Sequence, residues 1–131
     1  MILVDTSVLI DFFGGNITES SNRFEAVLNK GIPFGISSII FQEVLQGANS
    51  EKEYNLLKHY LSKQRFYNPR DSVESFADAA KIYVDCRRLG ITIRSTIECI
   101  IAQTALEHDL MLLHNDRDFI AMTKVVSLKF F

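Results

Sequence analysis

The chain of 131 residues has no tryptophan, only two prolines and six glycines, which excludes collagen-like and low-complexity compositions. It has two cysteines, Cys86 and Cys99, whose spacing matches no metal or redox motif, so we expect two buried thiols. No apolar run approaches the roughly 20 residues of a membrane span, and no basic leader precedes the first apolar residues, so a cytoplasmic protein is expected. The net charge of −2 disfavours nucleic-acid binding through bulk positive charge.

The overall amino-acid composition is typical of a globular protein. Hydrophobic residues make up 47% of the chain and charged residues 23%, and no linker or repeat interrupts it. A chain of this length buries enough surface for a complete core without disulfides or metals. We therefore expect residues 1–131 to form a single domain.

Short apolar runs alternate with amphipathic stretches along the chain. The predicted strands are residues 2–4, 33–37, 110–114 and 125–128. Apolar residues at helical spacing predict helices after the first strand, around Phe24, after Ser37 or Ser38, around Leu57, from Val73 to Val84, and from Ser95 to His108. Strands separated by helices predict an α/β fold, a three-layer α/β/α sandwich with a mainly parallel sheet of four or five strands.

Four acidic residues occupy equivalent places in this pattern. Asp5 ends the first strand, Glu43 lies in the helix after the second, Glu98 lies in the first turn of a helix, and Asp116 follows the third strand. Parallel sheets bind ligands at the carboxyl ends of their strands, so we expect the four carboxylates to converge there. Converging carboxylates raise one another's pKa unless a cation neutralises them, and Mg²⁺ or Mn²⁺ suits an all-carboxylate set.

Each acid also has an ordinary structural interpretation. Asp5 alone fits a helix N-cap equally well, and Glu43 alone fits a solvated helix face. Ser95 and Glu98 have the spacing of a capping box, and Asp116 fits a turn or a helix start. Only the order and placement of all four together favour a metal site.

Four segments resemble the motifs of PIN-domain ribonucleases and, within that family, the toxins of VapBC toxin–antitoxin systems. The segments are residues 2–11, 38–47, 90–102 and 112–119. The resemblance extends from Met1 to about Leu128 and implies a Mg²⁺-dependent endoribonuclease that blocks translation and growth. Water would be the nucleophile, and the products would carry a 5′ phosphate and a 3′ hydroxyl. The residues that match the motifs are, for catalysis and metal binding, Asp5, Glu43, Glu98 and Asp116, with Thr6, Ser7 and Asp118 orienting ligands and water.

Two residues depart from the family pattern. The third acid is usually Asp and here is Glu98, whose extra methylene lengthens its reach. His114 stands where the family often has Thr, and we expect it to pack at the strand end rather than to bind metal. These departures keep open a second interpretation, in which the chain is a catalytically inactive PIN-fold module that binds RNA or a partner.

The resemblance also implies partners. RNA is the expected substrate, and the candidate phosphate contacts are Arg94, Arg87, Lys63 and Arg65. Whether transfer, ribosomal or messenger RNA is cut stays open. A homodimer and a cognate VapB-type antitoxin are expected, with spare aromatic surface for them at Phe12, Phe13, Phe41, Phe130 and Phe131.

Two other phosphate-handling classes fit poorly. A phosphatase of the haloacid-dehalogenase type needs a second Asp two residues after the strand-end Asp, where this chain has Ser7. A response-regulator receiver domain has paired acids on its first loop, and Asp5 has no acidic neighbour. Neither class is expected.

Overall fold

The computed structural model describes residues 1–131, and its strands form one five-stranded parallel sheet with the order β3-β2-β1-β4-β5. The strands are β1 Ile2–Val4, β2 Phe34–Ile36, β3 Arg65–Phe66, β4 Met111–Leu113 and β5 Lys129–Phe130. The predicted sandwich with a parallel sheet is confirmed. The sheet has five strands rather than the four that the sequence pattern located.

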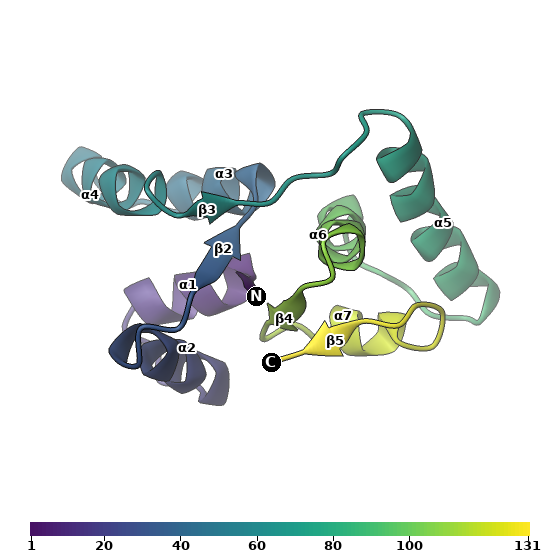
Figure 1. The fold of residues 1–131 in the computed structure, drawn as a ribbon, viewed down its shortest axis with the longest axis horizontal. Coiled ribbons are helices and arrows are strands. Elements are labelled where there is room, and N and C mark those ends of the chain that lie inside the picture. The colour runs from purple at the N-terminus through teal and green to yellow at the C-terminus, as the bar shows by residue number, and fades with distance from the viewer.

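Seven helices cover the sheet in two layers (Figure 1). The helices are α1 Thr6–Phe13, α2 Glu19–Asn29, α3 Ser38–Gln46, α4 Glu51–Leu61, α5 Glu74–Arg88, α6 Thr96–Glu107 and α7 Arg117–Met122. Helices α1 to α4 lie on one side of the sheet, and α5 to α7 lie on the other. This division follows from right-handed crossovers, because the chain builds the sheet outward from β1 in one direction and then returns to build it in the other.

The direction of chain winding reverses between β1 and β4. These two strands are neighbours, with Leu3 opposite Leu112 and Val4 opposite Leu113, although more than a hundred residues separate them in sequence. Parallel sheets of this kind bind ligands where the winding reverses, at the carboxyl ends of the strands. The end of β1 leads into Asp5, and the end of β4 leads toward Asp116.

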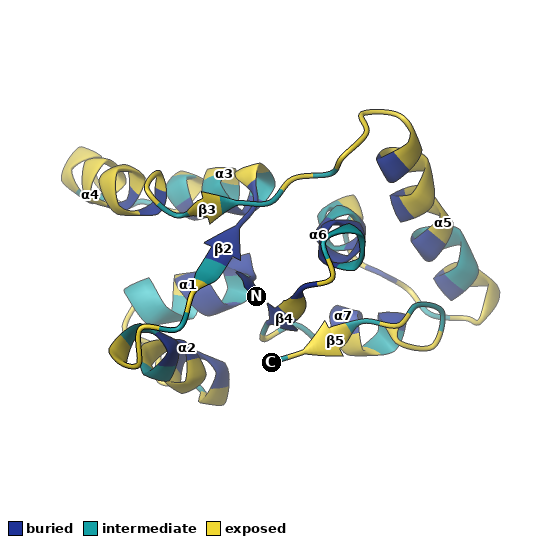
Figure 2. Ribbon diagram, in the orientation of Figure 1, coloured by how far each residue is buried: buried dark blue, intermediate teal, exposed yellow.

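The core lies on both faces of the sheet (Figure 2). All three residues of β1 are buried, as expected for a central strand covered by helices on both sides. Phe24 from α2 and Phe119 from α7 are fully buried on the two sides. Cys86 and Cys99 are buried free thiols, as predicted.

Glycine is required at position 35, in β2. A Cβ atom there would lie 2.6 Å from the Tyr67 ring and 2.9 Å from the carbonyl oxygen of Arg65. The absence of a side chain therefore lets β2 approach β3 and the loop that follows it.

One expectation about the strands was wrong, and one strand was not predicted. Residues 125–128 are not a strand, because the amides of Val125 and Val126 both donate to the carbonyl of Met122 and close the end of α7. The pairing with β4 is made just afterwards, where Lys129 lies opposite Met111. Strand β3 was missed because two residues are too few to show a period.

No helix is both long enough and apolar enough to cross a bilayer.

Candidate active site at the carboxyl ends of β1 and β4

Asp5 is buried at the end of β1 and caps α1. Its Oδ2 accepts hydrogen bonds from the backbone amide of Ser7 at 3.0 Å and from the Ser7 hydroxyl at 2.6 Å. Burial raises the pKa of Asp5 to about 6, and the negative charges of Asp116 and Glu43 add to this rise, while the Ser7 bonds oppose it. The N-cap interpretation is therefore confirmed, and the charges of two other acids act on the same carboxylate.

Ser7 connects the ends of the two central strands. Besides donating to Asp5, its hydroxyl accepts a hydrogen bond from the backbone amide of Asn115 at 2.9 Å. The Asn115 side chain donates to Asp11 Oδ2 in α1 at 3.1 Å. Asn115 was not anticipated as part of the site, because its contacts are with α1, a hundred residues away in sequence.

Glu43 lies in α3 and is half-buried. The hydroxyl of Thr6, which is itself buried, donates to Glu43 Oε1 at 2.7 Å. This bond crosses from α1 to α3 and holds the carboxylate on the side of Asp5. The predicted role of Thr6 in orienting an acid agrees with this contact.

Glu98 lies in the first turn of α6, and its Oε2 is buried without a hydrogen-bond partner. Burial raises the pKa of Glu98, its own backbone amide and the Ser95 side chain oppose the rise, and the charges of Asp116 and Glu43 add to it. Ser95 caps α6 by accepting from the amide of Ile97 at 3.1 Å, but its own amide does not bond to Glu98, so the expected capping box is only half formed. Its Oε2 is thus left available to another partner.

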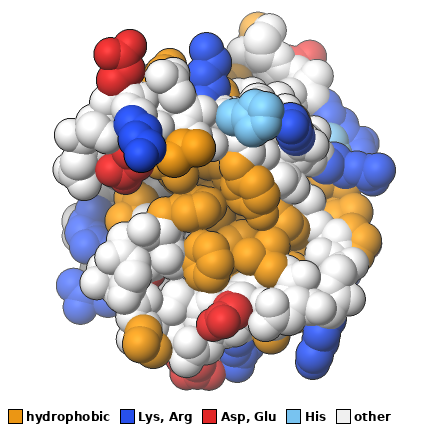
Figure 3. Space-filling view, turned by 90° about the vertical axis from the view of Figure 1, so that its left-hand side faces the viewer, with side chains coloured by type: hydrophobic (Ala, Val, Ile, Leu, Met, Phe, Trp, Pro, Cys, Tyr) orange, Lys and Arg blue, Asp and Glu red, His pale blue; other side chains and the backbone are white.

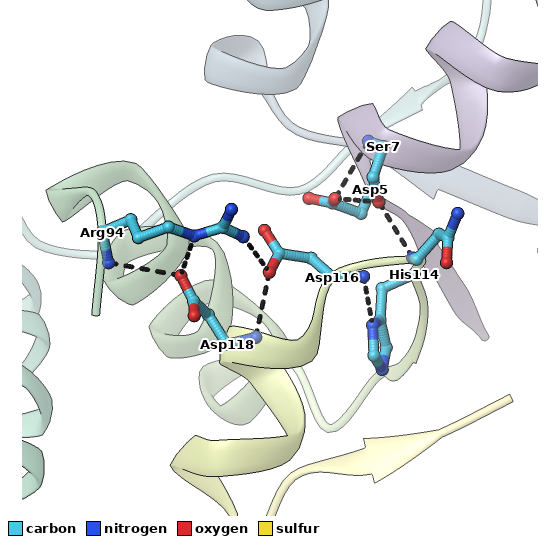
Figure 4. Close-up of polar contacts among 7 residues, drawn as sticks. Asp5, Ser7, Arg94, His114, Asp116 and Asp118 are labelled. Carbon is cyan, nitrogen blue, oxygen red and sulfur yellow. Dashed lines mark hydrogen bonds and ion pairs between the residues drawn. The ribbon is translucent and has the colours of Figure 1, made fainter. Parts of the chain in front are cut away.

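Asp116 and Asp118 at the start of α7 are held by Arg94 (Figure 4). Asp116 caps α7 through Oδ1, which accepts from the amide of Asp118 at 2.9 Å and from Arg94 Nη2 at 3.0 Å. Asp118 Oδ2 accepts from both the backbone amide and Nε of Arg94, each at 3.2 Å. Both acidic side chains are mostly covered, whereas 61% of the Arg94 side chain is exposed.

His114 packs at the end of β4, as predicted. Its ring lies 5.2 Å from that of Phe119 and 4.6 Å from that of Phe130, measured between centroids. Nδ1 accepts a hydrogen bond from the amide of Asp116 at 3.1 Å, which places the proton of the neutral ring on Nε2. Burial lowers the pKa of His114, so the imidazole is neutral at physiological pH and fixes the turn leading to Asp116.

All four predicted acids are carboxylates, the ligand type that a hard divalent cation binds. No three of them lie close enough together to form a complete metal-binding group. Each retains at least one oxygen that accepts no hydrogen bond from the protein, and in Glu98 that oxygen, Oε2, is buried. The free oxygens are Oδ1 of Asp5, Oε2 of Glu43, Oε2 of Glu98 and Oδ2 of Asp116. Carboxylate oxygens are the ligands that Mg²⁺ and Mn²⁺ prefer. The residues therefore fit such a cation.

The predicted RNA-binding cations differ in position. Arg87, at the end of α5, places its guanidinium 5.8 Å from the ring centroid of Tyr83. Tyr83 lines a largely apolar groove of about 640 Å³ that reaches the first residues of α3 and α6, the helices that carry Glu43 and Glu98. Lys63 and Arg65 are exposed just before and at the start of β3, an edge strand. The acids lie at the carboxyl ends of the strands, whereas Lys63 and Arg65 lie at the amino end of β3. These two cations are therefore at the opposite edge of the sheet from the acids.

The chain belongs to the PIN domain family, whose pattern matches residues 2–125. It is 28% identical over 130 residues to the VapC ribonuclease Mb1587 of Mycobacterium bovis and to the ribonuclease VapC11 of Mycobacterium tuberculosis. Each of these alignments covers 98% of this chain and 96% of the relative. The suspected resemblance to VapC ribonucleases is thus confirmed.

Solved structures share the fold over the whole chain. VapBC2 from Rickettsia felis, bound to a promoter DNA fragment, matches with a TM-score of 0.74 at 17% identity, covering 100% of this chain and 98% of that one. A toxin–antitoxin complex from Klebsiella pneumoniae matches with a TM-score of 0.63 at 26% identity and covers both chains fully.

Proposed function

We propose that this protein is a divalent-cation-dependent endoribonuclease and the toxin of a toxin–antitoxin pair. The observation that carries the proposal is the buried Glu98 oxygen that lacks any partner, in a carboxylate on which the charges of Asp116 and Glu43 act, as they do on Asp5 at the point where the chain winding reverses. Full-length similarity to VapC ribonucleases supports the same activity. Asp5, Glu43, Glu98 and Asp116 are the proposed ligands of Mg²⁺ or Mn²⁺.

A bound cation of this kind activates water and neutralises charge on the scissile phosphate. The protein positions the carboxylates that would hold this cation. Ser7 fixes Asp5 against both central strands, and Thr6 directs Glu43 toward the same place. Asp118 orients the segment before α6 through its bond to the Arg94 amide, which sets the position of the helix that carries Glu98. Each hydrogen bond fixes one carboxylate oxygen and leaves the other available.

The RNA is proposed to approach along the groove lined by Tyr83. Arg87 lies against that ring, so its guanidinium is placed to meet a phosphate while an unpaired base stacks nearby. Lys63 and Arg65, at the amino end of the edge strand β3, would contact only phosphates far from the acids. Single-stranded nucleic acids bind where positive charge lies beside aromatic rings, and Arg87 and Tyr83 supply one of each at this groove.

The test is cleavage of a total RNA pool by purified protein in Mg²⁺, in EDTA, and with Asp5→Asn. Asp78→Asn is the matched control, because Asp78 is exposed on α5 and in no ion pair. We expect cleavage by the wild type and the control, carrying 5′ phosphate ends, and none with Asp5→Asn or EDTA. Equal cleavage by wild type and Asp5→Asn would refute the enzyme and leave the alternative, an inactive PIN-fold module that binds RNA or a partner.

An antitoxin is proposed to cover the apolar hollow shown in Figure 3. That face carries α1 and α4, where Ile10 and Leu56 are exposed and the Phe13 ring lies 6.0 Å from that of Tyr60, between centroids. Large exposed apolar patches mark protein–protein interfaces. The toxin–antitoxin complexes among the structural neighbours support such a partner.

The aromatic residues expected to serve partners are only partly available. Phe12, Phe13 and Phe41 are half-buried against the core, and Phe41 packs on Phe66 with centroids 5.5 Å apart. Phe130 is exposed beside His114. The homodimer remains part of the proposal and is tested by the molar mass of the purified protein in solution.

A further inference from the structure

Arg94 makes three hydrogen bonds to the two acids that open α7 (Figure 4). Its backbone amide and Nε bind Asp118 Oδ2, and its Nη2 binds Asp116 Oδ1. The backbone bond anchors the residue, and the neighbouring Ile93 is buried in the core. The side chain, in contrast, is 61% exposed, so the guanidinium is free to change partners while the backbone stays in place.

The contact with Asp116 occupies a position that a cation would need. Asp116 Oδ1 accepts from Asp118 N and from Arg94 Nη2, and two donors fill both lone pairs of one carboxylate oxygen. With Arg94 in place, Asp116 therefore has only Oδ2 to offer. The guanidinium also supplies positive charge among acids that otherwise repel one another, which is what a metal ion would do.

We propose that Arg94 is an exchangeable counter-ion of the active site. Without a cation, its guanidinium neutralises Asp116 and Asp118 and helps to keep the acids from closing into a ligand group, which agrees with the open arrangement in the structure. When a divalent cation binds Asp116, the guanidinium leaves that carboxylate and turns outward. The guanidinium then contacts a phosphate of the RNA. Arg94 therefore helps to position the RNA only when the cation is bound. This inference rests on the proposed function of the same acids.

The direct test follows the Arg94 side chain by NMR during a Mg²⁺ titration of the full chain, without RNA. The ¹H–¹⁵N resonance of Arg94 Nε, assigned with Arg94→Lys, should be protected from solvent exchange in EDTA because it is bonded to Asp118. We expect Mg²⁺ to shift this resonance and to remove its protection. An unchanged Nε resonance, in a titration that shifts the carboxyl signals of Asp5 and Asp116, would overturn the exchange.

Arg94→Ala gives an independent measure through Mg²⁺ affinity, determined by calorimetry. Removing a competing, exposed ion pair should tighten Mg²⁺ binding about two- to fivefold. Arg117→Ala is the charge-matched control, because Arg117 adjoins Asp116 in sequence but is exposed and forms no ion pair. Equal tightening in the two variants would show a general charge effect and overturn the specific role of Arg94.

Binding of a 2′-O-methyl single-stranded RNA tests the second half of the proposal. Arg94→Ala should weaken this binding about three- to tenfold in Mg²⁺, since it removes a charge-assisted contact, and less in EDTA. The same loss in both conditions would show that Arg94 binds RNA without exchanging partners. If Mg²⁺ shifts no carboxyl signal and gives no binding heat, the cation site itself fails, and the proposed function fails with it.

Discussion

Ser7 holds Asp5 by two hydrogen bonds to the same carboxylate oxygen, at 3.0 Å from its amide and 2.6 Å from its hydroxyl. The hydroxyl also accepts from the amide of Asn115, so one small side chain fixes the acid at the end of β1 to the turn that follows β4. This contact determines how the two central parts of the site face each other.

Replacing Ser7 by Ala should therefore affect both stability and the acid it supports. The change removes the acceptor of the Asn115 amide, and because Asn115 is exposed and its amide can bond to water instead, we expect a loss of about 0.5–1.5 kcal/mol in the free energy of unfolding. The pKa of Asp5 should rise further above 6, because a bond that lowers it is lost. Urea unfolding measures the first effect and carboxyl NMR the second. Ser127→Ala, at an exposed hydroxyl, is the control, and equal stability of the two variants would contradict this role.

Asp5→Asn should stabilise the metal-free protein near neutral pH. The folded pKa of Asp5 is raised from 3.8 to about 6, so folding opposes its ionisation, and the wild type loses stability as pH rises from about 4 to about 6. Above that range the penalty is complete, and we expect Asn to recover about 1–3 kcal/mol. Near pH 4 the gain should largely vanish. Urea unfolding in EDTA at both pH values tests this, and a gain independent of pH would rule out the explanation.

The carboxylate of Glu98, rather than its length, should matter for cleavage. Glu98→Gln removes one proposed ligand and should lower the cleavage rate about 100-fold, a typical cost of losing one group that stabilises charge in the transition state. Glu98→Asp keeps the charge and should retain measurable Mg²⁺-dependent activity. Both rates are measured on one RNA with saturating Mg²⁺. If Gln were as active as Glu, the buried oxygen would have no part in binding the cation.

Leu56→Asp should abolish capture of the antitoxin without changing RNA cleavage. Leu56 is 62% exposed on α4, so a charge there costs little folding energy but disrupts an apolar interface. Leu89→Asp is a matched control, because Leu89 is 59% exposed at the end of α5. The measurement is inhibition of RNA cleavage by the partner that co-purifies with the wild type. Equal inhibition of both variants would place the interface elsewhere.

Local patterns were sufficient to predict much of the fold. The apolar run ending at Asp5 predicted β1, and Ser37 was identified as one of two possible starts of α3. Strand β3 was not predicted, because its two residues show no pattern of their own and form a strand only by pairing with β2. The final strand was placed too early for the same reason, since β4 selects Lys129–Phe130 as its partner.

By itself, the sequence determined which acids end strands and begin helices, because apolar runs and capping residues act over a few neighbouring positions. Only the tertiary structure decided that Ser7 meets Asn115, that Thr6 meets Glu43, and that Arg94 pairs with Asp116 and Asp118 instead of extending into solvent. Such contacts join segments that are brought together when the helices pack on the sheet. Their geometry depends on the burial and orientation of whole elements, which no local pattern encodes.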